Sequence, residues 1–244
     1  MQLQLRRSIS ERPSVKTEFA QTSIQLFNQS CESSLDSQQI SSLELGVKIA
    51  QYAFCGGYRP HRKTFESHLI GTASVLLHFG ASIEIVVAGL LHSLYEQGNM
   101  KLLPIPEETG NRQWIGAKLG ATVETLIQLN TETQWRQFTP DQLINRKETL
   151  RDTTKALLLI RTANYIEELA DFSLLYCAKA RGGDDVWMDA LQNFANTTGF
   201  PEMAQCLEKC RKRASNFTPI EQFTSKHTRS FRLPRYENLS SRSK

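Results

Sequence analysis

Apolar residues recur along most of the chain at the three- and four-residue spacing that is typical of amphipathic helices. No segment alternates apolar and polar residues between turn signals, as the strands of a sheet would. The fold class is therefore predicted to be all-α, a helical bundle with negligible sheet content. The predicted helices, in chain order, begin near residue 19 and cover residues 43–54, 65–79, 82–94, 114–129, 141–150 and 152–169, with two last helices that begin at Asp184 and Pro201 and end near Arg213.

The segment from Ser82 to Leu94 is apolar on nearly every face, so it is expected at the centre of the bundle. Ser82 is predicted to cap this helix, with Glu84 in its first turn, where a negative charge suits the helix dipole. In the helix that follows, Gly116 and Gly120 lie four residues apart. This spacing predicts a close approach between helices there.

At 244 residues, with 40% hydrophobic and 22% charged positions, the chain has an ordinary globular composition. The longest apolar run, 85–91, is too short to cross a bilayer, and no apolar stretch follows the N-terminal arginines as it would in a secretory signal. A cytoplasmic protein with no membrane partner is therefore predicted. The five cysteines are scattered without a C-x-x-C pair, which is typical of reduced structural thiols.

The net charge of +4 is unevenly distributed. Residues 1–17 carry +3 and residues 211–244 carry +7, which leaves −6 for the chain between them. An acidic body argues against a nucleic-acid-binding core. The chain is accordingly divided into a flexible N-terminal segment (1–17), a helical domain (18–213) and a basic disordered tail (214–244). The basic ends could contact phosphates or anionic surfaces, but solvated, disordered ends explain them more simply.

Several polar side chains lie within apolar helical segments, where burial is costly unless the groups are paired or bind something. They are His68, the pair His92-Ser93, the pair Glu96-Gln97, and Asn164 followed by Glu167-Glu168. On a continuous helix, Glu96 would share a face with His92. The pattern predicts a pocket, although each residue taken alone is also explained as a hydrogen-bonded core residue.

Four segments, F-E-S-H-L-I-G-T-A, A-G-L-L-H-S-L-Y-E-Q, K-L-G-A-T-V-E-T-L-I and I-R-T-A-N-Y-I-E-E-L, carry a family resemblance. Over roughly residues 58–172 the chain resembles the HD superfamily of metal-dependent phosphohydrolases, and most specifically its alarmone (guanosine tetraphosphate) hydrolase branch. The resemblance implies an HD-type helical bundle and a bacterial source. It also implies that His68, His92 and Asn164 are metal ligands for Mn²⁺ or another divalent metal, with Glu96 as the catalytic residue that orients water.

The chain departs from the family pattern at the acidic positions. Ser93 replaces the aspartate of the His-Asp doublet, and Asn164 replaces the distal aspartate. Gln97 replaces the acid that follows Glu96, and Glu168 stands where the family has an asparagine. Hard divalent cations prefer anionic oxygen donors, so the metal site implied by the resemblance is altered at two of its four ligand positions.

The remaining candidate residues are expected to line a ligand pocket. Close to a helix start, His61, Arg62 and Lys63 could meet a phosphate at the pocket mouth, although an exposed, solvated cluster explains them equally well. The full set of predicted pocket residues is Ser93, Gln97, Arg62, Lys63, Arg161 and Glu168.

Three functions remain open. The favoured one is a pseudoenzyme or regulatory module that binds a phosphorylated or nucleotide-like small molecule, because both acidic ligands are lost. The second is an active metal-dependent phosphohydrolase that uses His68, His92 and Asn164. The third is a helical accessory protein with a vestigial pocket, whose outer faces or basic ends contact an unspecified protein partner.

Overall fold

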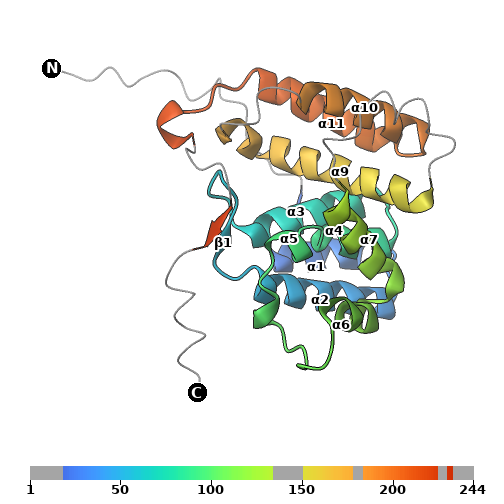
Figure 1. Ribbon diagram of the computed structural model, residues 1–244. Helices are drawn as coiled ribbons and strands as arrows, with labels where there is room; N and C mark the ends of the chain where they lie inside the picture. The colour runs from blue at the N-terminus through green and yellow to red at the C-terminus, as the bar shows by residue number, and fades with distance from the viewer. Residues whose placement is uncertain (1–18, 134–150, 178–183, 225–229, 233–244) are drawn as a thin grey trace.

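The computed structural model describes residues 19–133, 151–177, 184–224 and 230–232, which form an all-α bundle as predicted (Figure 1). The α-helices are α1 (Ser23–Glu32), α2 (Ser37–Ala53), α3 (Phe65–His78), α4 (Ile83–Leu90), α5 (Leu94–Gln97), α6 (Asn111–Leu119), α7 (Ala121–Glu132), α9 (Asp152–Ala170), α10 (Asp184–Thr197) and α11 (Pro201–Ser215). Short 3-10 helices are η2 (Met100–Leu102), η5 (Ser173–Tyr176) and η6 (Glu221–Phe223), and the strands are β1 (Gly57–Tyr58) and β2 (Phe231–Arg232). Within these residues, no helix combines the length and the apolar character needed to cross a membrane.

Side-chain caps fix where the first helices begin. Thr22 and Asp36 each form a capping box, with Gln25 and Gln39 respectively, at the starts of α1 and α2. Thr64 accepts a hydrogen bond from the backbone of the first turn of α3. This cap sets the start of α3 directly after the loop that leaves β1, and that loop carries much of the candidate site.

The centre of the bundle is α9, which packs against α3 and α4 on one side and against α10 and α11 on the other (Figure 1). Helix α2 lies beneath α4, on the side away from α9. Leu90 and Leu91 are fully buried between these layers, as predicted for the apolar segment that begins after Ser82. Ser82 occupies the N-cap position of α4 and Glu84 lies in the first turn, as predicted, but the side chain of Ser82 forms no capping hydrogen bond.

The helix predicted over 82–94 is broken before its end. Helix α4 ends at Leu90, the chain turns, and α5 begins at Leu94. In a continuous helix, the carbonyls of Gly89 and His92 would each accept from an amide four residues on. Here Gly89 O lies 2.8 Å from Nδ1 of His92, and His92 O accepts from Asn130 of α7 at 2.7 Å. The side chains of His92 and Asn130 therefore bind these two carbonyl oxygens, and the break changes the direction of the residues that follow.

The helix predicted over 114–129 is also two helices, α6 and α7, which meet at Gly120. Its φ of 92° lies in the region that only glycine adopts without strain, so Gly120 is a turn residue. A Cβ added at Gly116 would make only an ordinary contact, 3.8 Å from Glu124. The predicted close approach at these two glycines is therefore wrong. One occurs instead at Gly71 of α3, where an added Cβ would lie 2.5 Å from Cγ of Glu167 on α9.

Part of the segment predicted as a disordered tail is structured. Of residues 214–244, the described ones are 214–224 and 230–232, and they include the end of α11, η6 and β2. Strand β2 pairs antiparallel with β1, so that Phe231 lies opposite Tyr58. The sequence pattern missed this pair because two-residue strands are too short to show an alternation.

The helix predicted over 141–150 and the N-terminal segment 1–17 lie outside the described residues. Asp152, predicted to cap a helix, is instead the first residue of α9, and Arg151 occupies the N-cap position. An acidic residue in the first helical turn still suits the helix dipole.

The close approach at Gly71 generates a stability prediction. Gly71→Ala forces the new methyl group against Glu167, so it should lower the free energy of unfolding by about 1–3 kcal/mol, as overpacking does. Gly116→Ala is the matched control within α6 and should raise the free energy of unfolding by about 0.5–1 kcal/mol through helix propensity. Urea unfolding curves measure both. A Gly71→Ala protein as stable as Gly116→Ala would contradict the tight α3–α9 contact.

Candidate functional site

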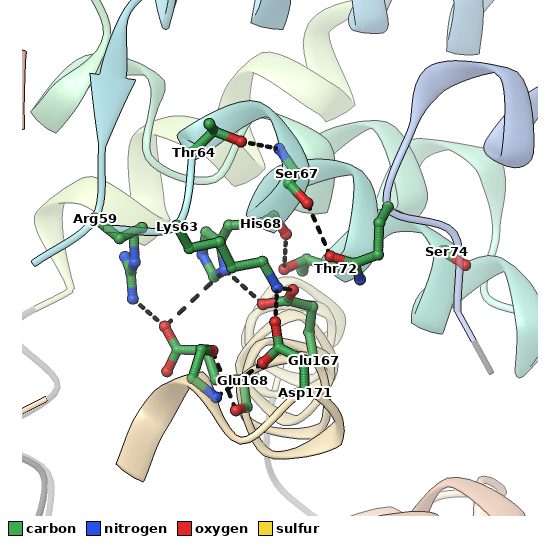
Figure 2. A network of polar contacts seen from close by, with 12 residues as sticks. Arg59, Lys63, Thr64, Ser67, His68, Thr72, Ser74, Glu167, Glu168 and Asp171 are labelled. Atoms are coloured by element: carbon green, nitrogen blue, oxygen red, sulfur yellow. Dashed lines mark hydrogen bonds and ion pairs between the residues drawn. The ribbon is translucent and has the colours of Figure 1, made fainter. Parts of the chain in front are cut away.

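A network of ion pairs joins the loop before α3 to the end of α9 (Figure 2). Arg59 pairs with Glu168, and Lys63 pairs with Glu167 and with Asp171, the latter at 2.6 Å. Glu167 and Asp171 lie one helical turn apart, so both face the same ammonium group. The side chains of Lys63, Glu167 and Glu168 are at most 10% exposed, which makes this a buried network.

His68 extends the network into the core of the bundle. Its side chain is fully buried, and Nδ1 lies 2.7 Å from Oε2 of Glu167 (Figure 2). Its other ring nitrogen, Nε2, has no hydrogen-bond partner among the described residues. A buried polar atom without a partner is rare in folded proteins, so Nε2 marks a place where the site is incomplete.

His92 lies against His68, with ring centroids 5.3 Å apart and the rings nearly perpendicular at 77°. Nδ1 of His92 lies 2.8 Å from the carbonyl oxygen of Gly89. A carbonyl can only accept, so Nδ1 carries the ring proton and Nε2 has the lone pair. Burial lowers the pKa of His92 to about 4, so this ring is neutral at pH 7.

Burial also controls the protonation of the ionic network. It lowers the pKa of His68 well below the usual value. It raises the pKa of Glu167 to about 8, with Asp171 acting in the same direction and Lys63 opposing it. Burial acts to lower the pKa of Lys63, but the charges of Glu167 and Asp171 outweigh it, so that pKa is raised. Lys63 therefore stays cationic, while Glu167 shares that cation with a second carboxylate and ionises only at higher pH.

The oxygen donors that the HD resemblance assigns to the site with the two histidines do not fit the divalent metal that it implies. Ser93 and Asn164 are buried but neutral, and a hard cation needs anionic oxygens. Glu167 and Glu168 supply carboxylates, yet both are paired with cations of the chain itself. In the part of the chain that the structure describes, no group of three or more His, Cys, Asp and Glu side chains could hold a metal ion.

A pocket of about 560 Å³ opens beside the ion pair of Arg59 and Glu168. Two of its lining residues, Arg59 and His61, carry side-chain nitrogens that are buried and have no hydrogen-bond partner in the described structure: Nε of Arg59 and both ring nitrogens of His61. Burial lowers the pKa of His61 despite the opposing charge of Glu168, so its ring is neutral, with one donor and one acceptor. The complete lining is Arg59, Pro60, His61, Ser93, Glu96, Gln97, Glu168, Leu174, Cys177 and Ser230.

The structure brings most of the sequence-predicted residues to one region. Ser93, Glu96, Gln97 and Glu168 line the pocket. Glu96 is exposed at its rim and accepts a 3.3 Å hydrogen bond from Gln97, because the break between α4 and α5 removes it from the helical face that it was expected to share with His92.

Three predicted residues lie elsewhere. Lys63 belongs to the buried network and not to the pocket lining. Arg62 is exposed with a φ of 69°, and its backbone N–H donates to Arg59 O, so it serves the turn. Arg161 contributes a positive charge that lowers the pKa of His92, and its guanidinium lies 4.8 Å from the ring centre of Tyr165.

Several functional residues were not predicted. Arg59 follows directly after β1, and only its partner Glu168, 109 residues away, reveals its role. Asp171 could have been found from its position one turn after Glu167 on a polar strip of α9. Cys177 and Ser230 carry no sequence signal, because they reach the pocket through the tertiary fold.

The raised pKa of Glu167 generates a pH-dependent prediction. Because the folded-state pKa lies near 8 and the usual value is 4.5, the stability that Glu167 contributes is full below pH 4.5 and is lost as pH rises through 8. From pH 7 to pH 9 the wild type should lose about 1 kcal/mol of unfolding free energy relative to Glu167→Gln, which has no carboxyl to titrate. His68 and His92, whose pKa values are lowered, titrate below this window.

The measurement is a pair of urea unfolding curves for each protein, one at pH 7 and one at pH 9. Groups that titrate in both proteins cancel in the comparison. Identical pH dependence of the two proteins would show that Glu167 is ionised throughout this range and would contradict the assignment.

One protein family matches part of the chain. The family described as "Domain of unknown function (DUF6817)" matches residues 55–133, about a third of the chain. The matched segment runs from β1 to α7 and includes His68, His92 and the pocket residues from Arg59 to Gln97, but not α9. No curated protein matches the chain. The similarity therefore covers one wall of the pocket and carries no named activity.

Proposed function

We propose that this chain is a cytoplasmic pseudoenzyme or regulatory module on an HD-type helical scaffold, and that it binds a small phosphorylated or nucleotide-like molecule without a metal. The pocket between the loop at Arg59 and the α5 segment is the binding site. Its volume of about 560 Å³ falls within the usual range of small-molecule sites.

The observation that carries the proposal is the set of buried, unpartnered nitrogens of Arg59 and His61. Leaving a buried donor unsatisfied costs about 1–3 kcal/mol per group, so such groups in a pocket indicate a ligand that completes them. One terminal nitrogen of Arg59 is held by Glu168, which leaves Nε–H available. Phosphate oxygens are strong acceptors for a guanidinium N–H and for an imidazole N–H.

The other polar residues that line the pocket suit the rest of such a ligand. Glu96 is exposed at the rim, so solvent screens its charge from a phosphate bound at Arg59. The carboxylate of Glu96 can accept hydrogen bonds from hydroxyl or amino groups of a ligand. The amide of Gln97 and the hydroxyl of Ser93 can both donate to such groups and accept from them. The pocket therefore fits a molecule with an anionic end and a hydrogen-bonding end.

An active metal-dependent phosphohydrolase is the second candidate. One observation favours it: His68 and His92 lie together, and Nε2 of His68 has no partner. The neutral Ser93 and Asn164 weigh against it, because they offer a divalent ion little charge compensation. Loss of the acidic ligands with retention of a polar pocket is better explained by binding than by turnover.

His61 provides the test of the ligand site. In a chelator-containing buffer, inorganic pyrophosphate should raise the melting temperature of the wild type, since a ligand at about 100 times its Kd adds about 2.7 kcal/mol of stability. His61→Leu should abolish this rise. The same substitution should stabilise the free protein by about 1 kcal/mol, because it replaces two unsatisfied buried nitrogens with apolar atoms.

His78→Leu is the matched control, because His78 is exposed and lies outside this pocket. It should respond to pyrophosphate as the wild type does, while sulfate at matched ionic strength should stabilise none of the proteins specifically. If His61→Leu keeps the pyrophosphate response, or loses stability, His61 is a core residue and the proposal fails.

A second test addresses the metal. The purified wild type should contain no stoichiometric manganese, iron or zinc by elemental mass spectrometry. Ser93→Asp combined with Asn164→Asp restores two anionic oxygens and should bind Mn²⁺, and adding His68→Ala should remove it. A folded double variant that gains no metal affinity would contradict the HD alignment. Stoichiometric metal in the wild type that His68→Ala removes would favour the hydrolase.

A further inference from the structure

The C-terminal strand is attached to the pocket by one arginine. The guanidinium of Arg232 donates to three backbone carbonyls: Cys55 O at 2.7 Å, Ala53 O at 2.7 Å and Gln97 O at 3.2 Å. These acceptors lie 135 to 179 residues away in the chain. Arg232 therefore ties the C-terminal segment to two distant helices at once.

The acceptors explain why an arginine occupies this position. Ala53 is the last residue of α2, and Gln97 is the last residue of α5. Carbonyls at helix C-termini lack intrahelical donors and lie at the negative end of the helix dipole. A guanidinium is cationic and presents several N–H groups in one plane, so it can satisfy both helix ends together.

The neighbours of Arg232 connect this attachment to the pocket. Phe231 stacks on Tyr58 with ring centroids 5.5 Å apart and an interplanar angle of 13°. Tyr58 directly precedes Arg59, and Arg59 and Gln97 both line the pocket. Ser230, the residue before the strand, is itself a lining residue. The attached segment thus contributes Ser230 to the wall of the proposed binding site.

We propose that Ser230–Arg232 is a detachable strap that controls access to the pocket. The strand pairing covers only two residues, which is marginal by itself, so the strap depends on Arg232 and on the stacked Phe231. Release of the strap leaves the carbonyls of Cys55 and Gln97 to bind water, while Ala53 O keeps its hydrogen bond from Asn99 N–H, and it removes Ser230 from the pocket lining. The strap rests on the pocket assigned under the proposed function, but it does not depend on which ligand binds there.

The test uses Cys177, a half-buried lining residue, as a reporter of access. The rate of alkylation by N-ethylmaleimide is followed at each cysteine by peptide mass spectrometry on the full chain. Arg232→Ala should speed the alkylation of Cys177 by about tenfold, which is the loss expected from one or two net hydrogen bonds, and Phe231→Ala should act in the same direction. Lys48→Ala, which removes a charge from the exposed face of α2, should leave the rate unchanged.

Two other cysteines separate strap release from unfolding. The rate at exposed Cys31 calibrates the reagent, and the rate at buried Cys210 reports global opening. Faster alkylation of Cys177 alone supports the strap. Equal rates at Cys177 in wild type and Arg232→Ala overturn it, and so does a parallel increase at Cys210.

A pyrophosphate arm keeps the two proposals distinct. Bound pyrophosphate should slow the alkylation of Cys177 in the wild type. If Arg232→Ala speeds alkylation while pyrophosphate has no effect, the strap stands and the phosphate ligand is wrong. If pyrophosphate protects Cys177 but Arg232→Ala changes nothing, the ligand stands and the strap is overturned.

Discussion

The largely buried ion-pair network at the end of α9 is the constraint on which the rest of the structure depends. Glu167, Glu168 and Asp171 face Lys63, Arg59 and His68 across the α3–α9 interface. Removing one partner of a buried ion pair costs about 3–5 kcal/mol, because it leaves a charge that neither water nor protein compensates. Helix α9 and the loop before α3 must therefore be placed together, and Gly71 leaves the space in which Glu167 lies.

The same network limits the chemistry of the site. In a metal centre, a bound cation would face these carboxyl groups, whereas here Arg59 pairs with Glu168, and Lys63 pairs with Glu167 and Asp171. The carboxyl groups are consequently committed, and the buried side-chain atoms left without partners among the described residues are nitrogens of Arg59, His61 and His68. The guanidinium N–H of Arg59 and the one ring N–H of His61 favour an oxygen-rich anion over a cation, which is the physical basis for preferring a phosphorylated ligand.

The sequence predicts the helices well, because apolar spacing directly reflects which face of each helix is buried. It predicts the grouping of His68, His92, Ser93 and Glu168 for the same reason: polar residues on apolar helices need partners. It misses the break after Leu90, which depends on a residue of another helix. The side-chain amide of Asn130 donates to His92 O in place of a backbone N–H.

It also misses residues whose roles come only from distant partners. Arg59 looks like an ordinary surface cation until α9 places Glu168 beside it. Arg232 looks like one basic residue of a tail, since nothing local shows that two helix ends lie within its reach. Local pattern determines which residues are buried, whereas the identity of a charge partner more than 100 residues away is a property of the tertiary fold.

Arg59 links the pocket to the interior of the bundle. Arg59 lines the pocket, one terminal nitrogen of its guanidinium pairs with Glu168, and its Nε has no partner among the residues that the structure describes. An anion bound in the pocket attracts the same guanidinium that compensates Glu168, so occupancy and the strength of the α9 ion pair compete for one positive charge. Glu168 also lies 4.0 Å from Nδ1 of His68, so a weaker pair between Arg59 and Glu168 changes the electrostatic environment of the fully buried imidazole. If the chain acts as the binding module proposed above, such a route would matter, because the output of a module without catalysis is a change in the protein that surrounds the ligand.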